Sequence, residues 1–267
     1  MKKNVIFVWI PKTAGGSIWK GVLAKQNGSV GNKELWNDAT LFNNEKIVSF
    51  GHMSILDLLS NGTISKDYFD NSFKFAFVRN PWDRAVSLYH YLRSRSVVKE
   101  RSFSSFCYRY LKHNQITPVG LYNVRGGFSQ CNKQISWLVD NNGKFFVDFI
   151  GRYEKLQKDF DKVCGLIGIP SKILPVEWFS RRSHYYFYYT KDTKEIVGDF
   201  YKEDIERFGY EFEKPNKFCF FPCLLLYNCI ENARLQKIKD LIKGYFPLLY
   251  TKFVNLLHKS IKYSKKH

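Results

Sequence analysis

A lysine, a threonine, two glycines and a serine follow an apolar run near the beginning of the chain. The stretch reads "FVWIPKTAGGSI" from Phe7 to Ile18. A strand that stops at such a turn before a helix presents backbone N–H groups at the helix N-terminus, where phosphate and sulfate bind. The glycines would supply the close approach and the positive φ of an anion-binding loop. The expected binding residues are Lys12, Thr13, Ala14, Gly15, Gly16 and Ser17, with hydroxyl donors from Thr13 and Ser17 and a mobile cation from Lys12.

The order of residues in this loop differs from that of the common nucleotide-binding loop, G-x-x-x-x-G-K-[ST]. Its lysine precedes the glycines, and Gly-Lys-Ser/Thr does not occur in it. No acidic strand end that would hold Mg²⁺ is evident in the sequence. Both observations argue against an ATPase or a kinase.

A second motif, "FVRNPWDRAVSLYHY", repeats the arrangement of strand, turn and helix. The apolar strand ends at Arg79, Pro81 suits the start of a helix, and Asp83 suits its first turn. Open α/β sheets bind ligands at the carboxyl ends of their strands. Arg79, with Ser87 on the helix, is therefore expected to hold one phosphate through guanidinium and hydroxyl donors. The alternative is an arginine that only fastens a loop.

Strands and helices alternate along the first four fifths of the chain. The expected strands are Asn4–Ile10, Glu45–His52, Phe73–Arg79 and Phe145–Gly151. A helix is expected to follow from Gly16, and others to cover Trp82–Arg95, Asn132–Val139, Tyr153–Ile167 and Thr193–Arg207. This alternation predicts an α/β fold with a mostly parallel central sheet and right-handed crossovers.

The character of the sequence changes after residue 214. Residues 215–267 hold ten Lys/Arg against two acids, which is +8 of the net charge of +18. Apolar residues at helical spacing predict a basic amphipathic helical extension to a domain of residues 1–214. We expect this extension either to lie on an anionic membrane surface or to pack against the domain or a second subunit.

Other features of the sequence predict where the protein is located and whether its cysteines are reduced. The N-terminal apolar run, Val5–Ile10, is too short for a signal peptide, so a cytoplasmic protein with reduced thiols at its six cysteines is expected. The run Phe218–Ile230 is too short to cross a bilayer. No metal site is expected, because Cys219, Cys223 and Cys229 lack a nearby fourth ligand.

Together, the two motifs resemble those of sulfotransferases that use PAPS (3′-phosphoadenosine 5′-phosphosulfate). "IPKTAGGSI" is similar to their 5′-phosphosulfate loop, and "FVRNPWDRAVSLYHY" is similar to their 3′-phosphate motif. The resemblance is greatest to the glycan-type sulfotransferase family 2, which includes uronosyl 2-O-sulfotransferases and bacterial members. It runs from Val5 to Phe212 and includes Gly51–His52 and "Q...WL" at Gln134–Leu138. Members often have threonine where this chain has Gly16.

This resemblance implies a P-loop-containing nucleotide hydrolase-like three-layer fold. It also implies transfer of a sulfuryl group from PAPS to a hydroxyl or amine of a carbohydrate, leaving PAP, with no metal required. Lys12 would lie beside the bond that breaks, the loop would hold the 5′-phosphate, and Arg79 and Ser87 would hold the 3′-phosphate. The acceptor would be a polysaccharide, oligosaccharide or glycolipid, and the positive charge mildly favours an acidic one.

A hydroxyl acceptor needs a general base, and the resemblance favours His52. An ordinary histidine pKa of about 6.5 suits that role. His90, on the helix that carries Ser87, is the rival. In "RRSHYYFYY", the residues Arg181, Arg182 and His184 are expected to contact PAP or the acceptor.

Two other functions compete with this interpretation. A nucleotide kinase or NTPase of related fold would use a similar loop, and a basic nucleic-acid-binding protein would explain the charge. No nucleic-acid-binding motif is present, and runs of charge are usually solvated faces, so no nucleic-acid partner is expected.

Overall fold

The fold comes from a computed structural model that describes residues 4–18, 40–41, 47–113, 129–175 and 182–214. These residues belong to the first of two compact units, Met1–Lys214. The predicted extension, residues 215–267, lies outside the described residues, as does the continuation of the first helix beyond residue 18.

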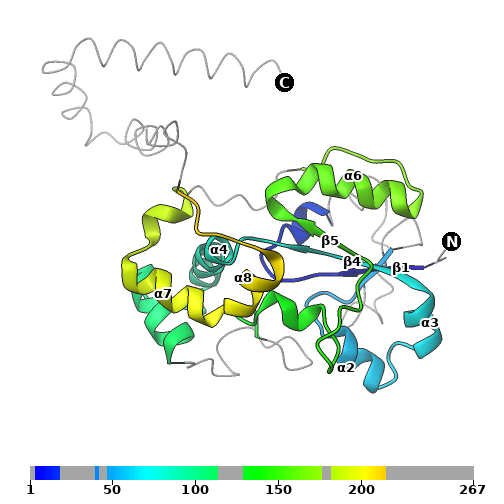
Figure 1. The fold of residues 1–267 in the computed structure, drawn as a ribbon, viewed down its shortest axis with the longest axis horizontal. Helices are drawn as coiled ribbons and strands as arrows, with labels where there is room; N and C mark the ends of the chain where they lie inside the picture. Colours follow the sequence, from blue (N-terminus) through cyan, green and yellow to red (C-terminus); the bar gives the residue numbers. More distant parts are fainter. Residues whose placement is uncertain (1–3, 19–39, 42–46, 114–128, 176–181, 215–267) are drawn as a thin grey trace, which may run out of the picture. The chain divides into compact units, whose positions relative to one another are not determined.

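A five-stranded sheet with the order β2-β3-β1-β4-β5 forms the centre of the fold (Figure 1). Its strands are β1 (Asn4–Val8), β2 (Thr40–Leu41), β3 (Ile47–Ser49), β4 (Ser72–Val78) and β5 (Phe149–Arg152). β1 pairs in parallel with β3 and β4, and β4 pairs in parallel with β5. Only the short edge strand β2 is antiparallel within the described sheet. The predicted mostly parallel sheet is therefore confirmed.

Alternating residues of β1 enter two different cores, as expected for a strand that is buried on both faces. Val5 and Phe7 pack with Phe160 of α6, whereas Ile6 and Val8 pack with Leu58 of α2. Figure 1 shows α6 on one side of the sheet and α2 on the other. The described elements thus form helix, sheet and helix layers.

α4 begins shortly after the carboxyl end of β4, whereas α3 ends immediately before its first residue. The α-helices with both ends in the described residues are α2 (Ile55–Ser60), α3 (Lys66–Asn71), α4 (Pro81–Ser94), α5 (Phe103–Phe106), α6 (Leu156–Ile167), α7 (Lys191–Phe200) and α8 (Lys202–Phe208). A π-helical turn covers Cys107–Lys112, and 3₁₀ turns cover Gln134–Trp137, Tyr153–Lys155 and Tyr185–Tyr188. A third core of aromatic and aliphatic residues joins α4, α5 and α7.

Two predicted helices are wrong in extent. The segment Asn132–Val139 forms only the 3₁₀ turn Gln134–Trp137, and the Asp204 carboxylate accepts the N–H groups of Gln134 and Ile135 at the start of this turn, each at 2.8 Å. The predicted helix Thr193–Arg207 is two helices divided at Tyr201, whose buried hydroxyl donates to the Cys131 carbonyl at 2.8 Å.

Two predicted strands are too long. The predicted strand Phe145–Gly151 begins only at Phe149, because the Asp148 side chain accepts the N–H of Lys74 at 2.8 Å and ends the pairing there. Phe145 forms an isolated bridge with Val139 instead. The predicted strand Glu45–His52 is confirmed only over Ile47–Ser49.

Candidate functional site

The loop after β1 is held in a strained shape by residues other than its glycines. Lys12 and Ala14 have φ values of 67° and 73°, a left-handed conformation that costs a residue with a Cβ roughly 1–2 kcal/mol. The expectation that Gly15 and Gly16 supply the positive φ was wrong. The Ala14 carbonyl instead accepts the N–H groups of Ser17 and Ile18 at 3.0 and 3.2 Å and starts the following helix.

Thr13 supports the loop from inside. Its side chain is completely buried, and its hydroxyl donates to the Ile10 carbonyl at 2.9 Å. That hydroxyl therefore stabilises the turn, whereas we had expected it to face a ligand. Lys12, Ala14, Gly15, Gly16 and Ser17 all line the cavity described below.

Gly15 is required by close packing. A Cβ built on Gly15 would lie 1.7 Å from Nε1 of the Trp9 indole, far inside any contact distance. The indole also makes an edge contact with the His52 ring, with 5.3 Å between ring centroids. Trp9 thus packs directly over the backbone of the loop and joins it to the end of β3.

We predict that Gly15→Ala displaces the Trp9 indole and destabilises the protein by about 1–3 kcal/mol, as overpacking does. Urea unfolding of the variant measures this loss. Gly62→Ala is the control for strain without crowding, because Gly62 has a φ of 76° but nothing within 4 Å of its Cβ position. Equal stability of Gly15→Ala and the wild type would contradict the packing of Trp9 on Gly15.

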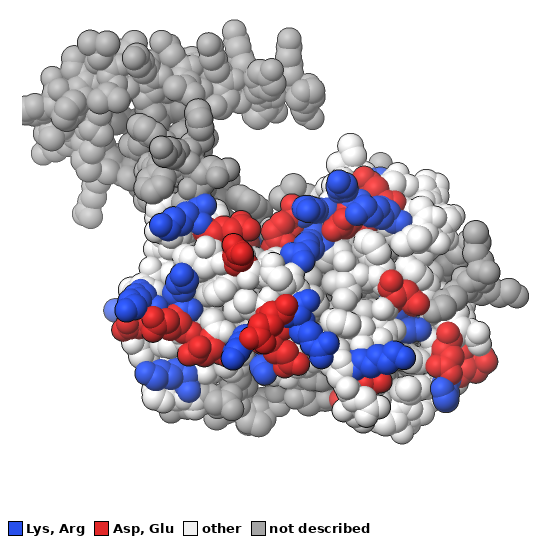
Figure 2. All heavy atoms as spheres, in the orientation of Figure 1, with Lys and Arg blue, Asp and Glu red and all other residues white. Residues whose placement is uncertain are grey.

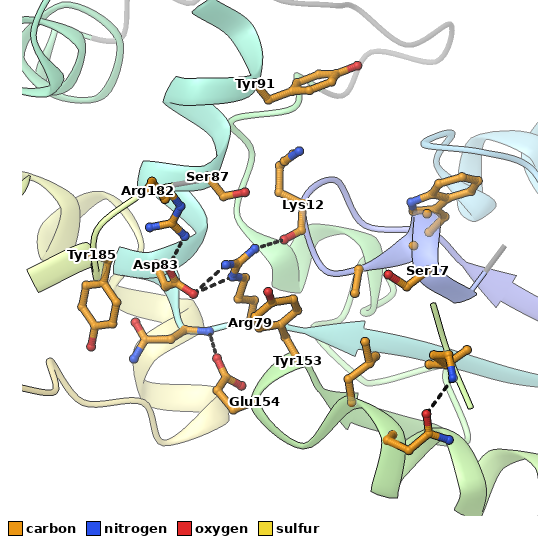
Figure 3. Close-up of a pocket in the computed structure, with 18 of the residues that line it drawn as sticks. Lys12, Ser17, Arg79, Asp83, Ser87, Tyr91, Tyr153, Glu154, Arg182 and Tyr185 are labelled. Carbon is orange, nitrogen blue, oxygen red and sulfur yellow. Dashed lines mark hydrogen bonds and ion pairs between the residues drawn. The ribbon is translucent and has the colours of Figure 1, made fainter. Parts of the chain in front are cut away.

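A cavity of about 650 Å³ opens at the carboxyl ends of β1 and β4 (Figure 3). The loop residues form one wall. α4 forms another through Asp83, Ser87 and Tyr91, which are spaced four apart and so lie on one face of the helix. Arg182, Ser183 and His184 reach the same cavity from a segment about one hundred residues later. The structure therefore brings Lys12, His52, Arg79, Ser87, Arg182 and His184 together, as the sequence predicts.

Arg79 and Arg182 share one buried counter-ion, Asp83. Nε and NH2 of Arg79 lie 2.8 and 2.7 Å from one Asp83 oxygen, and Arg182 pairs with the other oxygen. Burial alone would raise the pKa of Asp83, but the two arginines lower it further than burial raises it. Asp83 is therefore a carboxylate at neutral pH. Figure 3 shows the two arginines converging on it.

Contacts with three further residues fix the orientation of Arg79. Its NH1 donates to the Lys12 carbonyl at 3.1 Å, and its guanidinium lies 3.7 Å from the centroid of the Tyr153 ring. Its backbone exchanges two hydrogen bonds of 2.8 Å with the Gln134 amide. A guanidinium has five N–H groups, and the side-chain contacts use three of them, so two remain to serve a ligand.

Lys12 carries its ammonium group at the face of an aromatic ring. Nζ lies 4.2 Å from the centroid of the Tyr91 ring. Burial, reinforced by the positive charges of Arg79, Arg182 and Arg95, lowers the pKa of Lys12 to about 8. A bound anion would offset both effects, because it stabilises the charged form.

One of the two ring nitrogens of His52 is hydrogen-bonded to the backbone. Its Nδ1 lies 2.8 Å from the Trp9 carbonyl, and a carbonyl only accepts, so Nδ1 carries the proton and Nε2 keeps its lone pair. Burial has the largest effect on the pKa of His52 and lowers it, against the hydrogen bond to Trp9, which raises it. The charges of Lys12 and Arg84 lower it further, and the pKa falls to about 4. His52 is thus neutral at physiological pH, with one nitrogen able to accept a proton.

The two other candidate histidines differ in position. His90 does not line the cavity; its ring lies edge-on to Tyr89 and Tyr188, and its Nε2 is buried without a partner among the described residues. His184 lines the cavity, and its Nδ1 accepts the N–H of Tyr186 at 3.3 Å. Burial lowers the pKa of both histidines. Arg181 lies outside the described residues.

The sequence did not indicate the residue that fastens the loop. Arg84 is completely buried and donates to three backbone carbonyls, those of Pro11, Gln130 and Asn132, at 3.0, 2.9 and 3.0 Å. It therefore holds the beginning of the loop against the 129–132 segment. Its position inside the second motif, on the helix α4, was the only local signal.

Apolar and aromatic side chains also line the cavity, namely Trp9, Tyr153, Leu156, Leu174 and Pro175. Gln157 holds Leu174 in place, because its side-chain amide accepts the N–H of Leu174 at 2.8 Å and donates to the Lys172 carbonyl at 3.0 Å. Groups that can bind an anion and apolar side chains thus line the same cavity, an arrangement that suits a nucleotide.

No group of three or more His, Cys, Asp or Glu residues with metal-binding geometry is found among the described residues. Within the same part of the chain, no helix has the length and apolar character needed to cross a membrane.

Several known proteins are similar to this chain. An uncharacterized protein of Archaeoglobus fulgidus is 34% identical over 110 residues, which are 41% of this chain and 79% of that protein. The mouse sulfotransferase SULT7A1 complexed with PAP aligns with 85% of this chain and 90% of its own, at a TM-score of 0.47 and 16% identity. A sulfotransferase from Alicyclobacillus acidocaldarius aligns with 78% of this chain and 94% of its own, at a TM-score of 0.43 and 16% identity.

A match to a protein family covers nearly all of the fold described above. The model of the sulfotransferase family matches residues 1–211, from the strand before the loop to the end of the last described helix pair. It includes the loop, the Arg79 motif and the arginine that shares Asp83. Because the match spans most of its length, the chain belongs to the sulfotransferase family.

Proposed function

We propose that this protein transfers the sulfuryl group of PAPS to a hydroxyl of a carbohydrate acceptor. The observation that carries the proposal is the meeting, in one cavity, of the Lys12–Ser17 loop with Arg79, Ser87 and Arg182. Family membership supports a sulfotransferase, and the residues of the cavity support the donor. The competing kinase, NTPase and nucleic-acid readings have no comparable support.

The cavity suits a nucleotide with two separate phosphate positions. Backbone N–H groups at the helix that begins after Ala14, with the Ser17 side chain, favour an anion at the loop. Arg79, Ser87 and Arg182 offer guanidinium and hydroxyl donors at a second position. The apolar side chains of Trp9, Leu156 and Leu174 offer a surface for a purine. A donor with a 5′-phosphosulfate and a 3′-phosphate uses all three features, whereas ATP has no 3′-phosphate.

The residues then account for the transfer step. The acceptor oxygen forms a bond to sulfur while the bond from sulfur to the 5′-phosphate oxygen breaks, and PAP leaves with that electron pair. Lys12 neutralises the charge that grows on the leaving phosphate. His52 takes the hydroxyl proton on Nε2. The proposed step does not call for a metal ion.

The proposed acceptor is a carbohydrate. The resemblance to glycan-type sulfotransferases favours a polysaccharide, oligosaccharide or glycolipid, with transfer to oxygen and not to nitrogen. We also propose a cytoplasmic enzyme. Residues 215–267, outside the described residues, would lie on the inner face of the membrane or pack on a protein surface. Liposome co-sedimentation of the full chain and of a chain ending at residue 214 separates these two ideas.

We predict that Arg79→Ala weakens PAP binding by about 10- to 100-fold, the loss expected for charge-assisted hydrogen bonds of roughly 1.5–3 kcal/mol. Isothermal titration with PAP measures the change, and titration with ATP tests for a nucleotide-binding protein of another kind.

Arg152→Ala is a matched control, because Arg152 also packs over a tyrosine and donates to a backbone carbonyl, that of Phe208, but does not line the cavity. PAP affinity that stays the same in Arg79→Ala removes Arg79 from the proposed donor site. A response to ATP with Mg²⁺ but not to PAP would reject the proposed function altogether.

A further inference from the structure

One buried amide beside the cavity has no hydrogen-bond partner. Gln130 lines the cavity and is only 2% exposed, and its Oε1 is buried without a partner among the described residues. Two other described residues, Ser49 and His90, also have an unpartnered buried side-chain atom, but neither lines the cavity. Because a buried polar group without a partner costs stability, such a group at the edge of a cavity points to a ligand.

The backbone of Gln130 is held firmly, whereas its side chain is not. Arg84 donates from NH2 to the Gln130 carbonyl at 2.9 Å. The Ser129 hydroxyl accepts the N–H of Cys131 at 3.1 Å, and the Ser129 carbonyl accepts the N–H of Asn132 at 2.9 Å. The turn is therefore fixed at the cavity, while none of the described residues hydrogen-bonds the amide of Gln130.

Gln130 lies near the residues that are proposed to act on the reacting atoms. The Arg84 guanidinium joins the Gln130 carbonyl to the carbonyl of Pro11, the residue directly before Lys12. Arg84 is also close enough to His52 for its charge to lower the pKa of that histidine. One buried arginine thus connects the turn at Gln130 with the proposed position of transfer.

We propose that the Gln130 amide hydrogen-bonds a second hydroxyl of the acceptor, on the carbon next to the one that carries the sulfated hydroxyl. This inference rests on the proposed function and adds to it a residue that selects the acceptor. A hydroxyl both donates and accepts, so it matches either end of an amide, whereas the oxygens of the sulfuryl group only accept. A site built to pair with a hydroxyl discriminates against a molecule that lacks it, because the buried amide then stays unpaired.

Short-range contacts inside the cavity are needed to orient the acceptor. On the face drawn in Figure 2, basic and acidic side chains are interspersed, so long-range attraction gives little orientation to a molecule on that face. Hydrogen bonds act over a short distance and depend on direction. A bond from Gln130 to the neighbouring hydroxyl fixes the reacting hydroxyl relative to His52 and to the sulfur.

The test compares two glutamines that line the same cavity, Gln130 and Gln157. Gln130→Met replaces the unpaired amide with an apolar side chain of similar length. Gln157→Met is the matched control, because the Gln157 amide is already paired with the backbone of Leu174 and Lys172. In urea unfolding without ligand, Gln130→Met should be at least as stable as the wild type, and Gln157→Met should be less stable. A loss in Gln130→Met as large as that in Gln157→Met would assign the Gln130 amide to the fold and overturn the inference.

The probes for acceptor selection are ethylene glycol, which has a hydroxyl next to the reacting one, and ethanol, which lacks it. Each is the sole acceptor for labelled PAPS, and hydrolysis in buffer alone is subtracted. We expect the wild type to transfer to ethylene glycol about tenfold faster per hydroxyl than to ethanol. Gln130→Met should remove most of this preference by slowing transfer to ethylene glycol, and Gln157→Met should keep it. PAP affinity should be the same in Gln130→Met and in the wild type.

A wild type that binds PAP but transfers equally to both alcohols, or to neither, would overturn the role of Gln130. A preference that survives in Gln130→Met would overturn it as well. Weaker PAP binding in Gln130→Met would assign Gln130 to the nucleotide, and equal slowing with both alcohols would assign it to the sulfuryl group; both results contradict the inference. A wild type that does not bind PAP rejects the proposed function itself.

Discussion

Lys12→Ala is expected to reduce kcat about 10²- to 10³-fold while the fold survives. The reason is that removal of a single group that stabilises transition-state charge typically costs that much. Lys12 adopts a left-handed φ of 67°, and alanine bears the same Cβ penalty as lysine there, so the change removes the ammonium group without altering backbone strain. Initial rates with labelled PAPS measure the loss, and circular dichroism checks the fold.

The pH dependence of the wild type supplies a second measurement of the same residue. With a pKa of about 8 in the ligand-free protein, Lys12 loses its charge as pH rises through that value. kcat/KM reports the free enzyme, so it should fall on the alkaline side near pH 8. Lys12→Arg keeps its charge throughout this range and should lack that decline. A decline that is identical in both proteins would show that Lys12 is not its source.

His52→Ala is expected to lower kcat by about 10²- to 10⁴-fold, the usual contribution of a general base. The wild-type rate should fall in acid as pH drops through about 4, since His52 is then protonated and cannot accept a proton. A bound anionic donor raises this pKa, because it stabilises the imidazolium form. The acid limb of kcat should therefore lie at higher pH than that of kcat/KM.

His90→Ala and His184→Ala are the controls for this assignment. His90 lies outside the cavity, so its loss should leave turnover within a few fold of the wild type. His184 lines the cavity but uses Nδ1 to accept a backbone N–H, so its variant should affect binding more than kcat. Normal turnover in His52→Ala together with a large loss in His90→Ala would make His90 the base.

Short sequence motifs predicted those parts of the site whose residues are close together in the sequence. A buried strand, a turn and a helix start predict both the loop after β1 and the pair Arg79 and Ser87. Each of these three features is determined by residues that are neighbours in the sequence. The same reasoning located His52 at the end of the next strand. The approximate ends of these strands were therefore predictable, and pairing in a parallel sheet places these ends at one edge of it.

Contacts between distant segments could not be predicted in this way. The periodicity of residues 193–207 indicates one helix, but a hydrogen bond from Tyr201 to a carbonyl seventy positions away divides it. Asp83 looked like a residue of the first helical turn, and nothing local shows that Arg182 would share it. The glycines of the loop suggested positive φ, yet Trp9 packing explains Gly15 and the strain lies at Lys12 and Ala14.

The shared carboxylate of Asp83 has a consequence for turnover. Asp83 already offsets one of the two positive charges of Arg79 and Arg182 before any ligand arrives, so a phosphate that binds these arginines would compete with Asp83 for part of their hydrogen bonding. When the nucleotide leaves, Asp83 would again pair fully with Arg79 and Arg182, so the two buried cations would not be left without a counter-ion. In the proposed reaction, which would exchange PAP for PAPS in every cycle, this internal competition would favour fast release of the product over tight retention.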